Sequence, residues 1–297
     1  DTIVIGGSAG AGKINVYKRS GVSWSIELAN YVGTNGISAM QGMSVAITGS
    51  GDDIIWSGPN DSGVYGNNQG AIWSAHRTVS TWSQTLDKIT STLGVNQTTI
   101  GRSVAMSDDG RTIVIGIPDV DSQSGIAYVY ISNGIEWLVQ AALNPRPGAG
   151  ARIGARVAIS VDGNTVALSG HSDIGQGGAW IYTRNGAVWT LQANLTSPDS
   201  PVLSQSLRLA LNGPGNTFVA SGDSTNNGLL IWTRSGNVWS IKETALGSGA
   251  FSNNQISQID ISNDEAVIVA SSTGFGAIIY RLINGTWTAD GPNLMTF

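Results

Sequence analysis

The chain has 297 residues, a formal net charge of −5, no cysteine and only 12% charged residues, so disulfide frameworks, thiolate metal sites and a basic nucleic-acid-binding face are excluded. No apolar run approaches the ~18 residues of a membrane span, and 41% hydrophobic residues with 10 Trp argue against disorder. The 40 glycines follow no three-residue period, which excludes collagen and favours a glycine-rich all-β protein.

The predicted strands recur in one order along the chain. After a first strand at residues 2–7, short strands that end in tight polar turns are predicted at 44–48, 103–107, 156–160 and 208–212. A second apolar strand follows each of these turns, at 53–58, 112–117, 165–170 and 217–222. Third strands lead into two-residue hairpin turns, at 126–132, 179–184 and 229–234. The Asn-Gly pairs in these turns predict the type I′ conformation, and no convincing amphipathic helix is present.

A tryptophan on the fourth strand marks each unit. These tryptophans lie 58, 55, 52, 50 and 48 residues apart, and a second aromatic residue stands seven positions before five of them. Because their places in the units are constant, we predict that the six indoles form the structural core between units: Trp24, Trp82, Trp137, Trp189, Trp239 and Trp287.

Four antiparallel strands in each unit of about 50 residues, repeated six times, predict an all-β six-bladed β-propeller. The predicted blades of this single domain span residues 1–40, 41–99, 100–152, 153–204, 205–254 and 255–297. Blade 1 lacks its first strand in this sequence, because residue 1 stands at the start of a second strand. Either the blade is three-stranded, or the strand lies outside these residues in a longer chain, which we favour, or a partner supplies it. An open edge of this kind also invites self-association.

The residues beside the strands resemble the FG-GAP repeats of integrin-α-like β-propellers. One signature matches Ile100-Gly101 and Ile153-Gly154, and the other matches Ser57-Gly58-Pro59 and Gly116-Ile117-Pro118. The last two units carry neither signature. The resemblance implies that the second-to-third loops and the loops between blades share one face, the upper face. These loops vary freely here, and variable loops on a rigid scaffold are where binding sites concentrate.

We therefore predict a non-enzymatic binding or assembly module, without catalytic residues, that recognises a protein or a glycan through the upper-face loops. The candidate ligand-binding residues are polar side chains of these loops: Asp61, Asp119, Asp121, His171, Asp173 and Asp223. Three alternatives stay open: a carbohydrate-binding lectin, a structural subunit of a filament or virion shell, and a polysaccharide hydrolase or lyase. The last would use the upper-face carboxylates with His171 as acid–base groups.

One loop carries a calcium-like pattern. Asp119, Asp121 and Gln123 place oxygens at alternate positions, as a calcium loop does, although Tyr130 stands where such a loop carries its acid. No other cofactor is predicted. Glycosylation is predicted at four sequons, which together with the low charge fit an extracellular or particle-surface location: Asn60, Asn96, Asn194 and Asn284.

Overall fold

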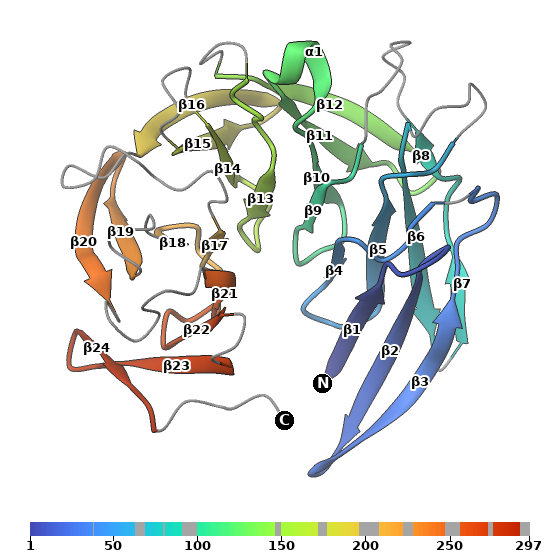
Figure 1. Ribbon diagram of the computed structural model, residues 1–297, viewed down its shortest axis with the longest axis horizontal. Helices are drawn as coiled ribbons and strands as arrows, with labels where there is room; N and C mark the ends of the chain where they lie inside the picture. Colours follow the sequence, from blue (N-terminus) through green and yellow to red (C-terminus); the bar gives the residue numbers. More distant parts are fainter. Residues whose placement is uncertain are drawn as a thin grey trace. The chain divides into compact units, whose positions relative to one another are not determined.

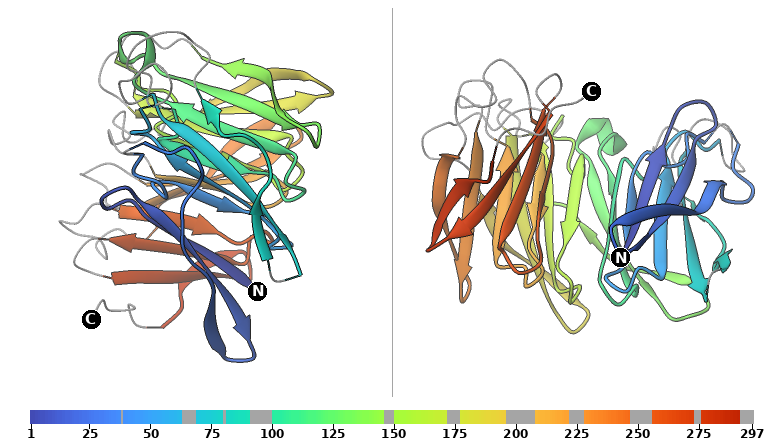
Figure 2. Two further views of the ribbon diagram at one scale, coloured as in Figure 1. Left: turned by 90° about the vertical axis from the view of Figure 1, so that its right-hand side faces the viewer. Right: turned by 90° about the horizontal axis from the view of Figure 1, so that it is seen from below.

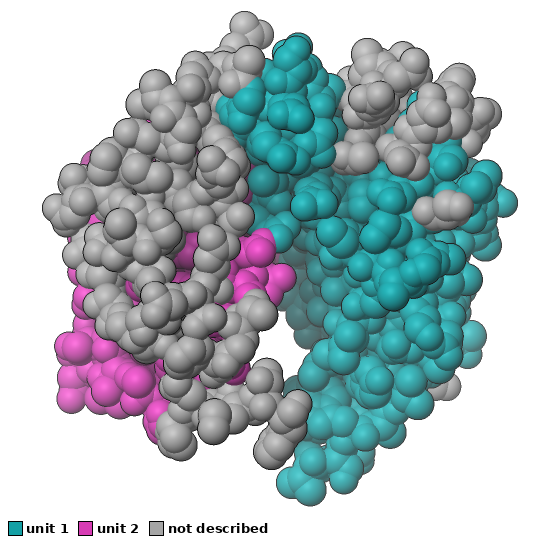
Figure 3. Space-filling view, viewed as in Figure 1, with its two compact units in different colours: residues 1–157 teal, residues 158–297 magenta. Residues whose placement is uncertain are grey.

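Figures 1 and 2 show the computed structural model of the chain, in which β-strands make up nearly all the regular structure. The chain consists of two compact units, Asp1–Val157 and Ala158–Phe297 (Figure 3). The described residues hold one short helix, α1 (Val120–Gln123), and no helix among them is long and apolar enough to cross a membrane. The structure describes residues 1–37, 39–62, 69–79, 81–90, 100–145, 150–171, 177–195, 208–221, 228–246, 256–272 and 276–291.

The first unit holds three antiparallel sheets. The first sheet consists of β1 (Thr2–Gly7), β2 (Lys13–Ser20) and β3 (Ser23–Tyr31). The second consists of β4 (Val45–Ile47), β5 (Asp53–Gly58), β6 (Ala71–Thr78) and β7 (Thr81–Gln84), and β8 (Ile89–Thr90) pairs with β6. The third consists of β9 (Ser103–Met106), β10 (Thr112–Ile117), β11 (Ile126–Ser132) and β12 (Trp137–Leu143). In the described part of the chain β1 pairs with β2 alone, as the sequence predicts.

Three further sheets of four strands follow, and the fourth sheet begins at the boundary of the second unit. It consists of β13 (Arg156–Ile159), β14 (Thr165–His171), β15 (Gly177–Asn185) and β16 (Val188–Leu195). The fifth consists of β17 (Leu209–Leu211), β18 (Thr217–Ser221), β19 (Leu229–Ser235) and β20 (Val238–Leu246). The sixth consists of β21 (Ile256–Ile261), β22 (Val267–Ser272), β23 (Gly276–Ile283) and β24 (Thr286–Ala289). Six such sheets define a six-bladed β-propeller, which confirms the predicted fold class.

Side chains two residues apart on one strand face the same side of a sheet, and β5 shows how this builds the core. Ile54 and Trp56 pack toward the first sheet, in a cluster with Ile14 and Val16 of β2, whereas Ile55 packs toward the third sheet. One strand therefore contributes to two inter-sheet cores. In the second unit, two more clusters join the fourth sheet to the fifth and the fifth to the sixth.

The marker tryptophans differ in burial. Trp287 and Trp82 are buried, with exposed fractions of 4% and 7%. Trp137, Trp189 and Trp239 are half-buried, and Trp24 is 43% exposed. The assignment of Trp24 to the core is therefore wrong: Trp24 is 43% exposed, whereas Trp82, on the corresponding edge strand of the second sheet, packs in the cluster with Ile14 and Val16. Two indoles that the repeat did not single out, Trp56 and Trp73, are fully buried and stack with ring centroids 6.3 Å apart.

The turn between the third and fourth strands of the sixth sheet has the predicted type I′ pattern, with Asn284 at φ 51° and Gly285 at φ 82° between paired Ile283 and Thr286. The corresponding turns of the fourth and fifth sheets differ. In the fourth sheet Asn185 pairs with Val188, so Gly186, with φ 61°, is the first central residue of the turn. The fifth sheet repeats this arrangement with Gly236 at φ 59°. A positive φ at the first central position alone is the type II′ pattern. Type I′ is wrong at these turns because the pairing register lies one residue further along than the Asn-Gly motif suggests.

Gly116 of β10 marks a close backbone approach within the first unit. A Cβ atom on Gly116 would lie 1.9 Å from the carbonyl oxygen of Gly154, and backbone has little freedom to move away. We expect Gly116→Ala to lower the free energy of unfolding by about 1–3 kcal/mol, as overpacking does. Urea denaturation measures this loss, with Gly7→Ala as the control, because a Cβ on Gly7 meets no atom within 4 Å. Equal stability of the two variants would contradict the close approach.

Candidate functional site

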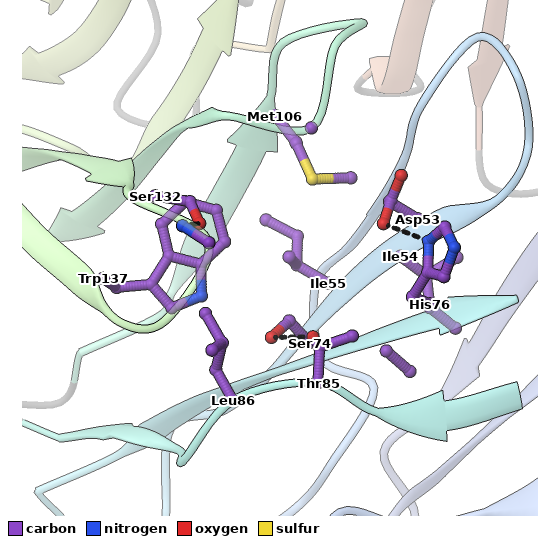
Figure 4. A pocket seen from close by; sticks show the side chains of 13 residues that line it. Asp53, Ile54, Ile55, Ser74, His76, Thr85, Leu86, Met106, Ser132 and Trp137 are labelled. Atoms are coloured by element: carbon purple, nitrogen blue, oxygen red, sulfur yellow. Dashed lines mark hydrogen bonds and ion pairs between the residues drawn. The ribbon is translucent and has the colours of Figure 1, made fainter.

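A pocket opens between the second and third sheets of the first unit (Figure 4). Its volume of about 170 Å³ is close to the ~150 Å³ of a cavity that holds one benzene molecule. It therefore accommodates a ligand with a single ring. Its hydrogen-bonding and aromatic side chains come from β5, β6, β11, β12 and the segment after β7: Asp53, Ser74, His76, Thr85, Ser132 and Trp137.

His76 and Asp53 form a hydrogen-bonded pair at one side of this pocket. Asp53 begins β5 and stands opposite His76 in the antiparallel register with β6, so both side chains leave the same face of the sheet. The Nδ1 atom of His76 lies 2.8 Å from Oδ1 of Asp53. The side chains are 45% and 38% exposed, so a ligand can reach them. A carboxylate acceptor holds the hydrogen of the neutral imidazole on Nδ1, which leaves Nε2 able to accept a proton.

Two hydroxyl groups lie between this pair and Trp137 in Figure 4. The Oγ atom of Ser74 lies 3.0 Å from Oγ1 of Thr85, and the backbone N–H of Thr85 donates to the carbonyl of Ser74 at 3.1 Å. When one hydroxyl donates to the other, the accepting hydroxyl keeps its own hydrogen for a further partner. The pair can therefore donate one hydrogen bond to a carbonyl oxygen in the pocket.

The opposite wall is aromatic and apolar. Trp137, the first residue of β12, is half-buried, and Met106 ends β9. Figure 4 shows the indole and the Met106 sulfur on the side of the third sheet, across from His76. An aromatic face and a polarisable sulfur pack well against a flat ligand. Apolar walls with a few convergent polar groups are the usual features of a small-molecule site.

Arg77, the neighbour of His76, faces the first sheet and anchors the site from behind. Its Nη1 donates to Oε2 of Glu27 at 2.8 Å and its Nε donates to Oδ1 of Asp52 at 2.9 Å. Burial by itself would raise the pKa of Glu27, but hydrogen bonds from Arg77 and Trp82 outweigh it and hold that pKa below its ordinary value. The hydrogen bond from Arg77 lowers the pKa of Asp52 as well. The network holds the end of β6, and with it His76, against the first sheet.

The predicted upper-face residues lie elsewhere. Asp61 is fully buried; its Oδ2 lies 2.7 Å from Nζ of Lys88, and its Oδ1 accepts the N–H of Ile37 at 2.8 Å. Asp61 therefore links the segments that contain Ile37 and Lys88. Asp119 pairs with Arg152 at 2.5 Å.

For the other four of these residues, a role in ligand binding stays a prediction. Asp121 is exposed on α1; His171 ends β14, where only its backbone is described; Asp173 and Asp223 lie outside the described residues. None of its described residues lines the pocket of Figure 4, and the upper-face ligand site stays a prediction.

The calcium and glycosylation predictions also remain open. Over the described ranges, no three His, Asp or Glu side chains gather as metal ligands. The calcium pattern Asp119, Asp121, Gln123 rests on sequence alone. Of the sequons, Asn194 and Asn284 are exposed, Asn60 is half-buried, and Asn96 lies outside the described residues.

Sequence reasoning missed the pair of His76 and Asp53. The two residues lie 23 positions apart, on either side of a long loop. A strand-register argument could have found them: Asp53 is the first residue of a predicted strand, and the next strand runs back beside it. Without the length of that strand, the position opposite Asp53 could not be chosen.

No protein-family model matches the chain, and no curated protein matches it in sequence. Solved structures do resemble it. The periplasmic gluconolactonase PpgL of Pseudomonas aeruginosa is 13% identical with a TM-score of 0.65, over 97% of this chain and 81% of that one. A putative 6-phosphogluconolactonase of Bacteroides fragilis is 12% identical with a TM-score of 0.64, over 97% and 79%. TolB of Acinetobacter baumannii is 11% identical with a TM-score of 0.55, over 96% and 61%.

These likenesses establish the shared fold, and they correct the function predicted from sequence. The prediction of a non-enzymatic binding module rested on a resemblance to surface propellers. It is overturned, because propellers similar over nearly the whole chain include lactonases, which are enzymes. A fold of this kind does not by itself imply binding without catalysis.

Proposed function

We propose that the chain is a hydrolase that opens a small cyclic ester, a lactone, in the pocket of Figure 4. The observation that carries the proposal is the His76–Asp53 pair at 2.8 Å beside a pocket sized for one ring. Neither residue is needed to hold the core, because both side chains are more than one-third exposed. The lactonase activities named for two propellers of the same fold support this choice of reaction.

In the proposed reaction Nε2 of His76 takes a proton from a water molecule as the water oxygen bonds to the lactone carbonyl carbon. The hydroxyl pair of Ser74 and Thr85 donates a hydrogen bond to the carbonyl oxygen as negative charge develops there. The ring C–O bond then breaks, and the imidazolium returns its proton to the departing alkoxide. The products are the carboxyl and hydroxyl groups of one open-chain hydroxy acid, so one water molecule is consumed. Asp53 acts as a positioning residue, because it orients the imidazole and stabilises its charged form.

Finer statements about family and location belong with this proposal. The similar structures reported above are not integrin propellers, so membership in the FG-GAP family stays a prediction. The name of the periplasmic gluconolactonase supports a location outside the cytoplasm, in line with the surface location favoured by the sequence. Glycosylation and binding of a protein or glycan partner stay predictions.

The test is a hydrolysis assay with the purified chain. Five- and six-membered sugar-acid lactones are compared with the methyl esters of the same acids, and acid release is followed by titration at constant pH. The proposal expects at least one lactone to be opened faster than in buffer alone, and faster than its methyl ester. Rates equal to buffer for every lactone would remove the proposal.

A further inference from the structure

An arginine fills the space between the first and second sheets that corresponds to the pocket. Arg77 stands opposite Trp82 in the β6–β7 register, and its Cζ lies 5.4 Å from the centroid of that ring. From the preceding sheet, Glu27 of β3 accepts from Nη1 at 2.8 Å and Thr2 of β1 accepts from Nη2 at 3.4 Å. One guanidinium thus lies between an indole of its own sheet and two acceptors of the sheet before it.

The second unit repeats this arrangement between its fourth and fifth sheets. Arg234 stands opposite Trp239, with Cζ 5.5 Å from the ring centroid. Its Nη1 donates to Oε1 of Gln192 at 3.2 Å, and its Nη2 reaches Oγ1 of Thr165 at 3.5 Å. Two independent occurrences show that the repeat builds a guanidinium site between neighbouring sheets.

The third sheet departs from this rule. Ser132 stands opposite Trp137 as Arg77 stands opposite Trp82. The backbone N–H of Ser132 donates to the carbonyl oxygen of Arg111, just before β10, at 2.9 Å. The backbone N–H of Arg77 donates in the same way to the carbonyl oxygen of Asp52, just before β5, at 2.7 Å. Serine has no cation and a much shorter side chain, so the space that an arginine fills at the other two sites is open here, and Ser132 lines the pocket.

The acceptors of the preceding sheet are still present. Asp53 begins β5 as Thr2 begins β1, and Thr85 follows the tryptophan of its sheet by three residues, as Glu27 does. Asp53 and Thr85 both line the pocket. The site has thus lost its own cation and has gained a carboxylate at the position where the other two sites carry a threonine.

We propose that this pocket binds a guanidinium group carried on an unbranched alkyl chain. The cation would lie against the face of Trp137 and donate to the carboxylate of Asp53 and the hydroxyl of Thr85. A planar guanidinium stacks on an indole and offers donors in several directions, which a compact ammonium does not. The inference goes beyond the proposed hydrolysis, since it concerns binding alone, and a guanidinium ligand would compete with a lactone for the same space.

The test compares three ligands that share a propyl chain and differ in charge and planarity. N-propylguanidinium carries the three-carbon chain of arginine, N-propylurea is its uncharged planar counterpart, and propylammonium has the charge without the plane. Calorimetric titration gives the affinities, and the NMR signal of the Trp137 indole, assigned through Trp137→Phe, gives the location. We expect the guanidinium to bind at least about tenfold more tightly than the urea, because its hydrogen bonds to Asp53 are charge-assisted. Equal affinities, or an unchanged Trp137 signal, would overturn the inference.

A matched pair of variants provides a second test. Ser132→Arg should place the missing arginine in the pocket and abolish propylguanidinium binding, whereas Ser132→Ala should retain it. Asp53→Asn should weaken binding about tenfold. Thermal melting checks that each variant is folded. A folded Ser132→Arg protein that binds like the parent would show that the ligand lies elsewhere.

These measurements need no turnover, so the two proposals can fail separately. A protein that binds propylguanidinium but opens no lactone keeps the inference and removes the proposed function. A protein that opens lactones but binds propylguanidinium no better than the urea keeps the function and removes the inference.

Discussion

Replacing His76 with glutamine is expected to lower kcat/KM for lactone opening by about 10²–10⁴-fold, the usual contribution of a positioned general base. Glutamine keeps a hydrogen-bonding side chain beside Asp53 but cannot take a proton from water. The imidazole is 45% exposed and is hydrogen-bonded to Asp53, so the fold should tolerate the change. Lactone titration measures the rate, and thermal melting checks the fold.

The control is Asp121→Asn on the exposed helix α1, outside the pocket. This variant should keep the parental rate, which also tests whether the upper-face loops take part in the reaction. A His76→Gln protein as active as the parent would remove His76 as the base. A large loss in Asp121→Asn instead would move the site to the upper face.

Replacing Arg77 with methionine should lower the free energy of unfolding by about 3–5 kcal/mol, because it removes the closest cation from the largely buried carboxylate of Glu27. The side chain of Arg77 is 7% exposed and that of Glu27 is 11% exposed. Methionine keeps the apolar stem that lies over Trp82, so the loss reports mainly on the ion pairs. Urea denaturation near neutral pH measures it.

The matched control is Arg281→Met. Arg281 also pairs with a carboxylate, Asp290, but these side chains are 52% and 45% exposed, and exposed ion pairs contribute about 0–1 kcal/mol. Similar losses in the two arginine variants would contradict the stabilising role assigned to the buried network.

Because of the same network, the free energy of unfolding should depend on pH. The pKa of Glu27 is below its ordinary value of 4.5 in the folded chain, so its contribution is complete above that value and is lost as the pH falls through the folded pKa. Arg77→Met removes the partner that lowers this pKa. The variant should therefore lose less stability than the parent between neutral and strongly acidic pH. Parallel acid titrations of unfolding that keep a constant difference would contradict this coupling.

The sequence by itself determined the six sheets, because strands and tight turns depend on neighbouring residues. The first strand was predicted at residues 2–7 and lies at Thr2–Gly7, and the strand predicted at 112–117 has the same bounds as β10. The first sheet, which has three strands in the described residues, followed from the same repeat. The fourth-strand tryptophans gave the period of the repeat but not their burial, since exposed Trp24 and buried Trp82 occupy the same repeat position, each on an edge strand of its sheet.

Only the tertiary structure decided the site. Pairing of Asp53 with His76 depends on the register of two strands joined by a long loop, and no local pattern gives that register. The pocket depends on a second long-range fact: Ser132 faces Asp53 and Thr85 of another sheet, at the place where two other blades carry an arginine. A serine at the end of a strand does not by itself predict a site in the sequence. Packing sets it beside a carboxylate and an indole without the cation that two other blades carry there, and this opens the pocket that we propose as a ligand site.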